Sequence, residues 1–104
     1  MGGNMQPQGH VQTLLRMLLA RQQPQAACDA PRWKVMRGLD IEVESAMPLA
    51  VVEDLARRGH RITRANDSYM DFGSGQFIWR LGDPAIHGYA AASDSRRDGL
   101  VAGC

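Results

Sequence analysis

Apolar residues between positions 11 and 19 recur with the spacing that places them on one side of an α-helix. They are Val11, Leu14, Leu15, Leu18 and Leu19, at i, i+3, i+4, i+7 and i+8. Pro7 suits the first turn of such a helix, because the N–H that proline lacks would have no partner there. The spacing therefore predicts a helix from about Pro7 to about Arg21 with one apolar stripe.

The next residues predict a short second helix and then a hairpin. Pro24 begins the helical segment PQAACDA, which we expect to end at Ala30, because the following proline disfavours the α region there. RWKVM and DIEVES then predict two strands, with Gly38 in the turn between them. Alternation within the second strand gives two faces: Ile41, Val43 and Ser45 on one, Glu42 and Glu44 on the other.

A third helix is predicted between Pro48, which suits a first turn, and Gly59, which suits a left-handed C-terminal cap. Its apolar stripe consists of Leu49, Val51, Val52 and Leu55. Two i, i+4 ion pairs are expected on its solvated face: Glu53 with Arg57, and Asp54 with Arg58.

The remaining sequence completes an α+β pattern. HRITRA predicts a strand and NDSYMDFGSG a loop. QFIWRL and AIHGYAAA predict a closing hairpin that turns at residues 82–84, and the tail SDSRRDGLVAGC lacks the periodicity of an element. With 104 residues, 44% of them apolar and 22% charged, residues 1–104 fit one domain in which helices pack on a mainly antiparallel sheet.

The charge balance argues against two classes of partner. Twelve Lys and Arg residues against 11 Asp and Glu residues give a formal net charge of +1, so the chain lacks the basic footprint of a nucleic-acid or anionic-membrane protein. Its longest apolar run is interrupted by Arg16 and is too short to span a bilayer. No signal peptide opens the sequence, so a cytoplasmic location is expected for the chain as written.

Neither cysteine nor histidine spacing indicates a metal or redox site. Cys28 and Cys104 are far apart in the sequence, which favours a buried helical residue and a loose terminal thiol. His10, His60 and His87 lack the short spacings that metal ligands prefer. We therefore expect no metal and no cofactor.

Three further patterns are better explained by ordinary structure than by chemistry. Residues 73–75, GSG, lack the third glycine of a dinucleotide fingerprint and predict a loop. None of the scattered serines lies in a nucleophile elbow: Ser68, Ser74, Ser93 and Ser95. The charges of the tail predict local ion pairs rather than an anion clamp: Asp94, Arg96, Arg97 and Asp98.

Gly2 and Gly3 are the candidate site residues. They precede a predicted helix, whose first N–H groups are unpaired and carry partial positive charge. Glycines there let backbone N–H groups approach a developing oxyanion, as acyl-transfer enzymes require. A flexible terminus is the alternative explanation for the same two residues.

Six motifs together carry a resemblance to a known family. In chain order they are MGGNMQPQGHVQTLLRML, APRW, VESAMP, RRGH, FGSGQ and SDSRRDGLVAGC. Their order and spacing resemble the C-terminal half of the small subunit of gamma-glutamyltranspeptidase, also called glutathione hydrolase. The resemblance covers essentially all 104 residues. It implies part of the four-layer αββα sandwich of the N-terminal-nucleophile hydrolases.

The resemblance also implies an activity for the whole family protein. There, a threonine freed by self-cleavage attacks the gamma-glutamyl amide of glutathione or a related compound, and the acyl group passes to water, an amino acid or a peptide. Gly2 and Gly3 match the glycine pair whose N–H groups form the oxyanion hole. The nucleophilic threonine, the paired serines and the large-subunit arginine of the family lie upstream of this sequence. Ser95 stands in place of proline and Cys104 in place of a terminal tyrosine.

Two interpretations from different classes follow. In the first, the chain is a piece of such an enzyme, inactive alone, and it meets gamma-glutamyl compounds such as glutathione only when the upstream part is supplied. In the second, it is a non-catalytic interaction domain. In either case we expect a homodimer or higher oligomer, because part of a sandwich exposes apolar faces and sheet edges.

Overall fold

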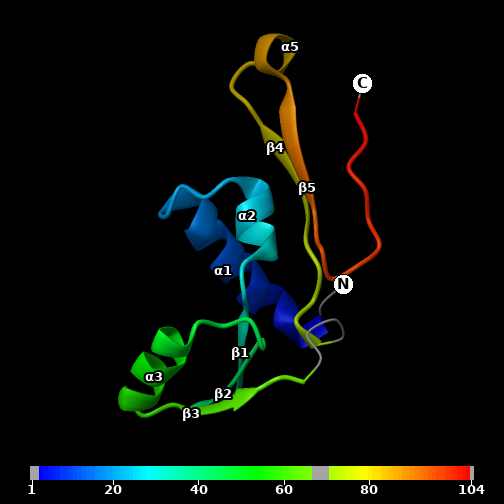
Figure 1. Ribbon diagram of the computed structural model, residues 1–104. Coiled ribbons are helices and arrows are strands. Elements are labelled where there is room, and N and C mark those ends of the chain that lie inside the picture. Colours follow the sequence, from blue (N-terminus) through cyan, green and yellow to red (C-terminus); the bar gives the residue numbers. More distant parts are fainter. Residues whose placement is uncertain (1–2, 67–70, 104) are drawn as a thin grey trace.

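The computed structural model describes residues 3–66 and 71–103 (Figure 1). Its elements are η1 (Gly3–Met5), α1 (Gln6–Leu18), α2 (Pro24–Asp29), β1 (Trp33–Arg37), β2 (Asp40–Val43), α3 (Leu49–Arg57), β3 (Arg61–Arg64), β4 (Gln76–Arg80), α5 (Pro84–His87) and β5 (Tyr89–Ser93). The mixture of helices and strands confirms the predicted α+β class. The predicted loop NDSYMDFGSG lies in part outside the described residues.

The strands form two small sheets. One has the order β1-β2-β3, and the other is the β4–β5 hairpin. The β1–β2 and β4–β5 pairs are antiparallel, as predicted, and Gly38 has the left-handed φ of +57° in the first of these turns. The β2–β3 pair is parallel, because α3 carries the chain back to the start of the sheet before β3 begins.

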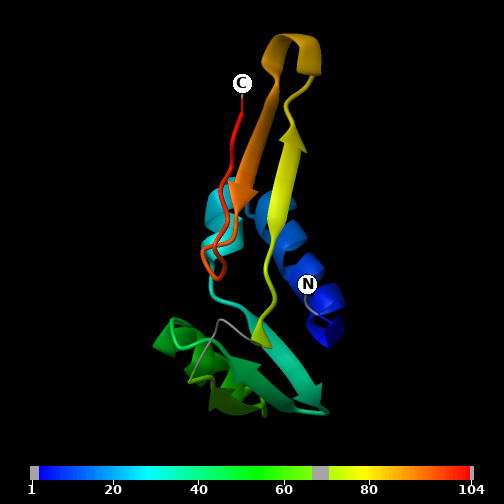
Figure 2. The same cartoon turned by 90° about the vertical axis from the view of Figure 1, so that its right-hand side faces the viewer.

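The molecule is elongated, with principal extents of 49 × 27 × 22 Å. The β4–β5 hairpin projects from the body and carries α5 at its tip (Figures 1 and 2). Helix α2 packs against β5 at the base of this hairpin, and the three-stranded sheet and α3 form the opposite end of the molecule. No helix within the described residues is long and apolar enough to cross a membrane.

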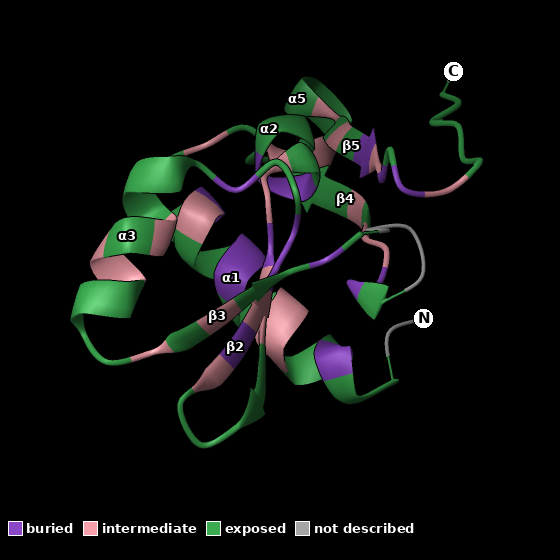
Figure 3. Ribbon diagram, turned by 60° about the horizontal axis from the view of Figure 1, so that its bottom comes forward, coloured by how far each residue is buried: buried purple, intermediate pink, exposed green. Residues whose placement is uncertain are grey.

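The buried core is small and divided (Figure 3). One cluster joins Met5, from the start of the chain, to Ala65 and Phe72. The other lies on the three-stranded sheet and consists of Ile41, Val43 and Met47, with Trp33, Val52 and Ile62 packed against it. Much of the apolar surface therefore remains outside any core.

Helix α1 differs from the prediction in its end and in the face that it buries. It ends at Leu18 rather than near Arg21, which has a left-handed φ of +52°. The apolar stripe is exposed: Val11, Leu14, Leu15, Leu18 and Leu19. The buried residues are Gln12, Thr13 and Met17 instead, so the helix turns a largely polar face towards its own chain.

Three other predictions are corrected. Residues Pro84–His87 form a short helix rather than the start of a strand, because Asp83 caps the turn by accepting from the N–H of Ala85. The strand predicted through Ser45 ends at Val43, and Glu44 is buried rather than solvent-facing. Arg57 pairs with Asp54, one turn away, instead of with Glu53, while the predicted Asp54–Arg58 pair is present.

Candidate functional site

Gly3 lies at the start of a continuous helical run. It opens η1, which leads directly into α1, and its φ is +44°. Apart from Gly3 itself and its chain neighbours, no atom of the described residues lies within 4 Å of the position that a Cβ would occupy, so the backbone there has open space beside it. Gly2 lies outside the described residues. The structure thus places one of the two candidate glycines where a helix begins, and the oxyanion-hole role stays a prediction.

The helix start is electrostatically suited to an anion. Met5, the residue that precedes α1, makes no side-chain capping hydrogen bond, and the first turn of α1 contains no acidic residue. No acidic side chain in the first turn of α1 therefore neutralises the partial positive charge of the helix N-terminus, although Asp71 lines the adjacent groove. A groove of about 620 Å³ begins at Gly3 and Asn4 and continues along Lys34 and Val35.

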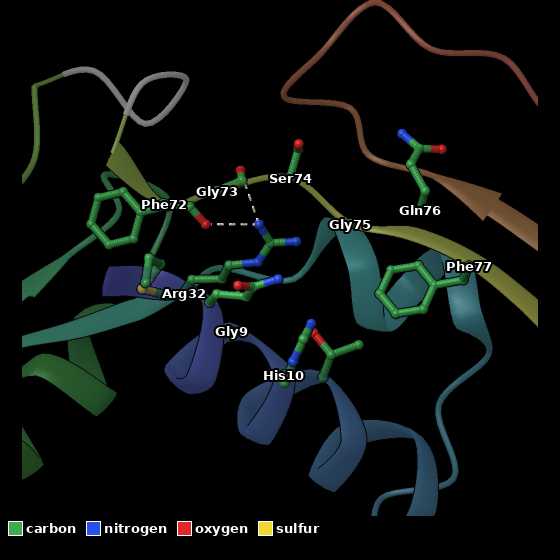
Figure 4. A pocket seen from close by; sticks show the side chains of 12 residues that line it. Gly9, His10, Arg32, Phe72, Gly73, Ser74, Gly75, Gln76 and Phe77 are labelled. Atoms are coloured by element: carbon green, nitrogen blue, oxygen red, sulfur yellow. Dashed lines mark hydrogen bonds between the residues drawn. The ribbon is translucent and has the colours of Figure 1, made fainter. Parts of the chain in front are cut away.

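A second, smaller pocket of about 150 Å³ lies between α1 and the loop that precedes β4 (Figure 4). His10 enters it from α1, and Arg32 closes it from the opposite side. The Arg32 guanidinium donates to the carbonyl oxygens of Phe72, at 2.9 Å, and Gly73, at 3.2 Å. The loop is thus held by backbone contacts with a buried cation.

The structure explains why glycine occupies positions 73 and 75. Gly73 has a φ of +71°, which side-chain-bearing residues rarely adopt. A Cβ at Gly75 would lie 2.5 Å from the Phe77 ring. The prediction that residues 73–75 form a loop is confirmed.

Four buried charges connect distant parts of the chain. Arg32 bonds Asp94 at 2.6 Å, and Arg96 bonds Glu44 at 2.5 Å and Asp94 at 3.0 Å. Each of the four residues is at most 7% exposed. The two positive and two negative charges balance. We call this set the Arg32–Glu44–Asp94–Arg96 cluster. It joins the ends of β1, β2 and β5.

Asp94 and Arg96 act in the cluster as fixed charges rather than as an acid–base pair. Burial alone would raise the pKa of Asp94, but N–H groups of Arg96 and Gly75 and the Arg32 guanidinium lower it to about 2. Burial opposes the charge of Arg96, yet its hydrogen bonds to Glu44 and Asp94 raise its pKa above the usual value. Neither group titrates near neutral pH. The predicted Asp94–Arg96 pair is local, but it also belongs to this longer-range cluster.

Cys28 has the surroundings of a structural thiol. It is fully buried in α2 and lies 3.7 Å from the carbonyl oxygen of Gly75. Burial, helped by nearby Asp94, raises its pKa to about 11. The thiol is therefore protonated at neutral pH and is a poor nucleophile.

The histidines do not converge. His10 lies on α1, His60 follows α3, and His87 ends α5. Among residues 3–66 and 71–103, no group of three or more His, Cys, Asp or Glu side chains could hold a metal ion.

The sequence pattern did not predict that Arg32 and Glu44 belong to the buried cluster. Arg32 and Asp94 are separated by 62 positions, and Arg96 and Glu44 by 52. The one sequence signal for burial of Glu44 was its position directly after an apolar strand residue. Strand alternation pointed the other way and predicted that Glu44 faces solvent.

Solved structures with a similar fold include a cephalosporin acylase, the transpeptidase CapD and a gamma-glutamyltranspeptidase. A cephalosporin acylase from Bacillus halodurans is 44% identical in sequence to this chain, with a TM-score of 0.89. The alignment covers 98% of this chain and 18% of the acylase chain. The transpeptidase CapD of Bacillus anthracis is 19% identical, with a TM-score of 0.75, and the alignment covers 94% of this chain and 57% of the CapD chain. Gamma-glutamyltranspeptidase from Pseudomonas nitroreducens, complexed with L-DON, is 21% identical, with a TM-score of 0.73. The alignment covers 92% of this chain and 48% of the transpeptidase chain. No curated protein sequence matches the chain.

The fold is α+β, with helices beside small, mainly antiparallel sheets, as in the three solved structures. The gamma-glutamyltranspeptidase family model matches residues 1–104, so the chain belongs to the gamma-glutamyltranspeptidase family. It spans between about a fifth and just over half of the three structures compared above.

Proposed function

We propose that this chain forms part of an enzyme that transfers or hydrolyses gamma-glutamyl groups. The observation that carries the proposal is the position of Gly3 at the start of η1, which leads directly into α1, beside a groove; the first turn of α1 has no acidic residue. Backbone N–H groups there suit the oxyanion of a tetrahedral acyl intermediate. Family membership supplies the reaction class: an amide donor, an acyl-enzyme, and water or an amine as acceptor.

We propose further that the nucleophile comes from another part of the family fold. The two threonines of this chain are Thr13, inside α1, and Thr63, inside β3, so neither offers the free α-amine that activates an N-terminal nucleophile. Cys28 is buried and protonated. The chain then contributes the oxyanion hole and its supports, and it is inactive alone.

The donor has two chemically related candidates. Gamma-glutamyl amides such as glutathione follow from the family, and acylated cephalosporins are supported by the acylase at 44% identity. Both donors carry an amide whose carbonyl oxygen becomes an oxyanion during attack. We favour the gamma-glutamyl donor and treat the cephalosporin as an outcome of the test.

A chimera tests this proposal. This chain replaces the matching segment of the Bacillus halodurans acylase, which the 0.89 TM-score makes geometrically reasonable. We expect the chimera, and not the isolated chain, to release aniline from a gamma-glutamyl anilide. Release from an acylated cephalosporin alone would reassign the donor. A folded, self-processed chimera that is inactive on both donors would contradict the proposal, as would steady turnover by the isolated chain.

A non-catalytic interaction domain is the second candidate, and one observation favours it. The apolar stripe of α1 is exposed, with Leu14 at 50% and Leu18 at 59%. Exposed apolar patches of this kind typically mark association surfaces. This candidate predicts self-association of the isolated chain.

A further inference from the structure

Two glutamines of α1 pair with the backbone of β1 as a neighbouring strand would. Gln8 accepts from the N–H of Val35 at 2.7 Å and donates to its carbonyl oxygen at 3.3 Å. Gln12 accepts from the N–H of Trp33 at 3.0 Å and donates to its carbonyl oxygen at 2.8 Å. Each side-chain amide thus satisfies both backbone groups of one strand residue.

These backbone groups lie on the free edge of the sheet. The order β1-β2-β3 leaves one side of β1 without a strand partner. The N–H of Glu44 donates to the carbonyl oxygen of Arg32, so residue 32 faces β2. Because hydrogen-bonding direction alternates along a strand, Trp33 and Val35 face away from β2. Without the glutamines, their polar groups would be open to another strand.

A third contact continues the same series. Arg16 donates to the carbonyl oxygen of Pro31 at 3.0 Å. Helix positions 8, 12 and 16 therefore contact strand-side positions 35, 33 and 31, in antiparallel order. Four helical residues rise about 6 Å and two strand residues rise about 6.6 Å, so the two spacings match. Gln12 also donates to the carbonyl oxygen of Gln8 at 3.1 Å, which ties adjacent steps together.

We propose that Gln8, Gln12 and Arg16 form a side-chain ladder that replaces an edge strand and thereby fixes the position of α1. The ladder explains why α1 turns its polar face towards its own chain and leaves its apolar stripe outside. It also closes the β1 edge to strand addition.

The ladder sets the position of the candidate oxyanion hole. Gly3 lies five residues before Gln8 in the same helical run, so a shift of α1 along β1 moves Gly3 by a similar amount. Gln8 and Gln12 are then positioning residues for the proposed reaction. This half of the inference rests on the proposed function, whereas the ladder itself does not.

Amide hydrogen exchange in the full chain tests the ladder. Gln8 is half-buried, so its substitution is compatible with folding. In Gln8→Met, which has neither donor nor acceptor of comparable strength, we expect the Val35 amide to exchange about tenfold faster or more. In Gln8→Glu, the carboxylate still accepts the shorter bond, so protection of Val35 is retained at neutral pH. The Trp33 amide, held by Gln12, is the internal reference.

Gln6→Met is the matched control, because Gln6 is exposed, lies about one half-turn away on α1, and has no hydrogen bond to β1 among the described residues. We expect it to leave Val35 exchange unchanged. Equal Val35 exchange in Gln8→Met and the unsubstituted chain would overturn the ladder, as would loss of protection in Gln8→Glu equal to that in Gln8→Met.

The Gly3 amide signal tests the positioning. It should shift in Gln8→Met, where the first ladder step is removed, and stay in place in Gln8→Glu. An unmoved Gly3 signal with an exposed Val35 amide would overturn the positioning role. An inactive chimera would contradict the proposed reaction and leave these exchange results unaffected, so the two failures are distinguishable.

Discussion

At the scale of single residues, the Arg32–Glu44–Asp94–Arg96 cluster is the strongest internal constraint. It holds the segment after β5 against the ends of β1 and β2, and Asp94 also accepts from the N–H groups of Gly75 and Arg96. Breaking a buried ion pair by removing one partner leaves an uncompensated charge inside the protein. Each member is therefore expected to be costly to replace.

Asp94→Asn should lower the free energy of unfolding at pH 7 by about 3–5 kcal/mol, because both arginines lose a buried counter-charge. The folded-state pKa of Asp94, about 2, lies below its ordinary value of 3.8. Its contribution is therefore complete above about pH 4 and is lost as the pH falls towards 2. Urea unfolding at several pH values should show the two proteins converging in acid.

Asp54→Asn is the control for this experiment. Asp54 forms exposed pairs with Arg57 and Arg58 on α3, which typically contribute less than about 1 kcal/mol. Equal losses of stability in the two variants would contradict the central role of the buried cluster.

The cluster could not have been predicted from the sequence. Local ion pairing in the tail was foreseeable from Asp94 and Arg96, which lie two positions apart. The partnership with Arg32 and Glu44 depends on how three strand ends meet in space. Gly3, by contrast, was predicted just in front of a helix, and it opens η1 directly before α1, because helix termini depend on local sequence.

At the scale of elements, local periodicity predicted where helices and strands lie better than which sides they bury. The hairpins β1–β2 and β4–β5 were both predicted, because turn residues and strand patterns are close in sequence. The side of α1 that is exposed was not predicted. Its orientation is set by Gln8 and Gln12 pairing with β1, a contact across 21 to 27 positions.

Two glycine substitutions separate helix propensity from backbone conformation. Gly59 follows α3 with a φ of +95°, and Gly9 lies inside α1 with an ordinary helical φ. A Cβ meets nothing within 4 Å at either position. Gly59→Ala should therefore destabilise the chain by about 1 kcal/mol or more through strain, whereas Gly9→Ala should stabilise it by about 0.5–1 kcal/mol.

Thermal unfolding measures both effects, with an expected fall in Tm for Gly59→Ala and a rise for Gly9→Ala. Changes of the same sign in the two variants would contradict these helix boundaries.

At the scale of the whole molecule, the exposed apolar surface is large for the core that supports it. The two buried clusters are small, the β4–β5 hairpin projects, and the α1 stripe faces outwards. This arrangement fits a chain that spans only part of its structural relatives. In the isolated chain, we expect a second copy to cover the stripe.

Sedimentation velocity over a range of concentrations tests this expectation. The unsubstituted chain should form dimers or larger species, and a Leu14→Gln, Leu18→Gln variant should shift towards monomer, because these side chains form the exposed stripe. Leu100→Gln is the matched control, since Leu100 is 89% exposed and lies in the tail. Monomer at every concentration for the unsubstituted chain would contradict the expectation.

In the proposed function, the backbone N–H groups at the start of this chain stabilise an acyl oxyanion. The most direct measurement is kcat for gamma-glutamyl anilide in the chimera with Gly3→Pro and Gly3→Ala. Proline removes the N–H donor and cannot adopt the φ of +44° found at Gly3, so we expect kcat to fall by about 10²–10³-fold or more. Alanine keeps the donor and adds only the strain of a φ of +44°, so it should lose about tenfold or less. Equal kcat values for Gly3→Pro and the unsubstituted chimera would contradict the account.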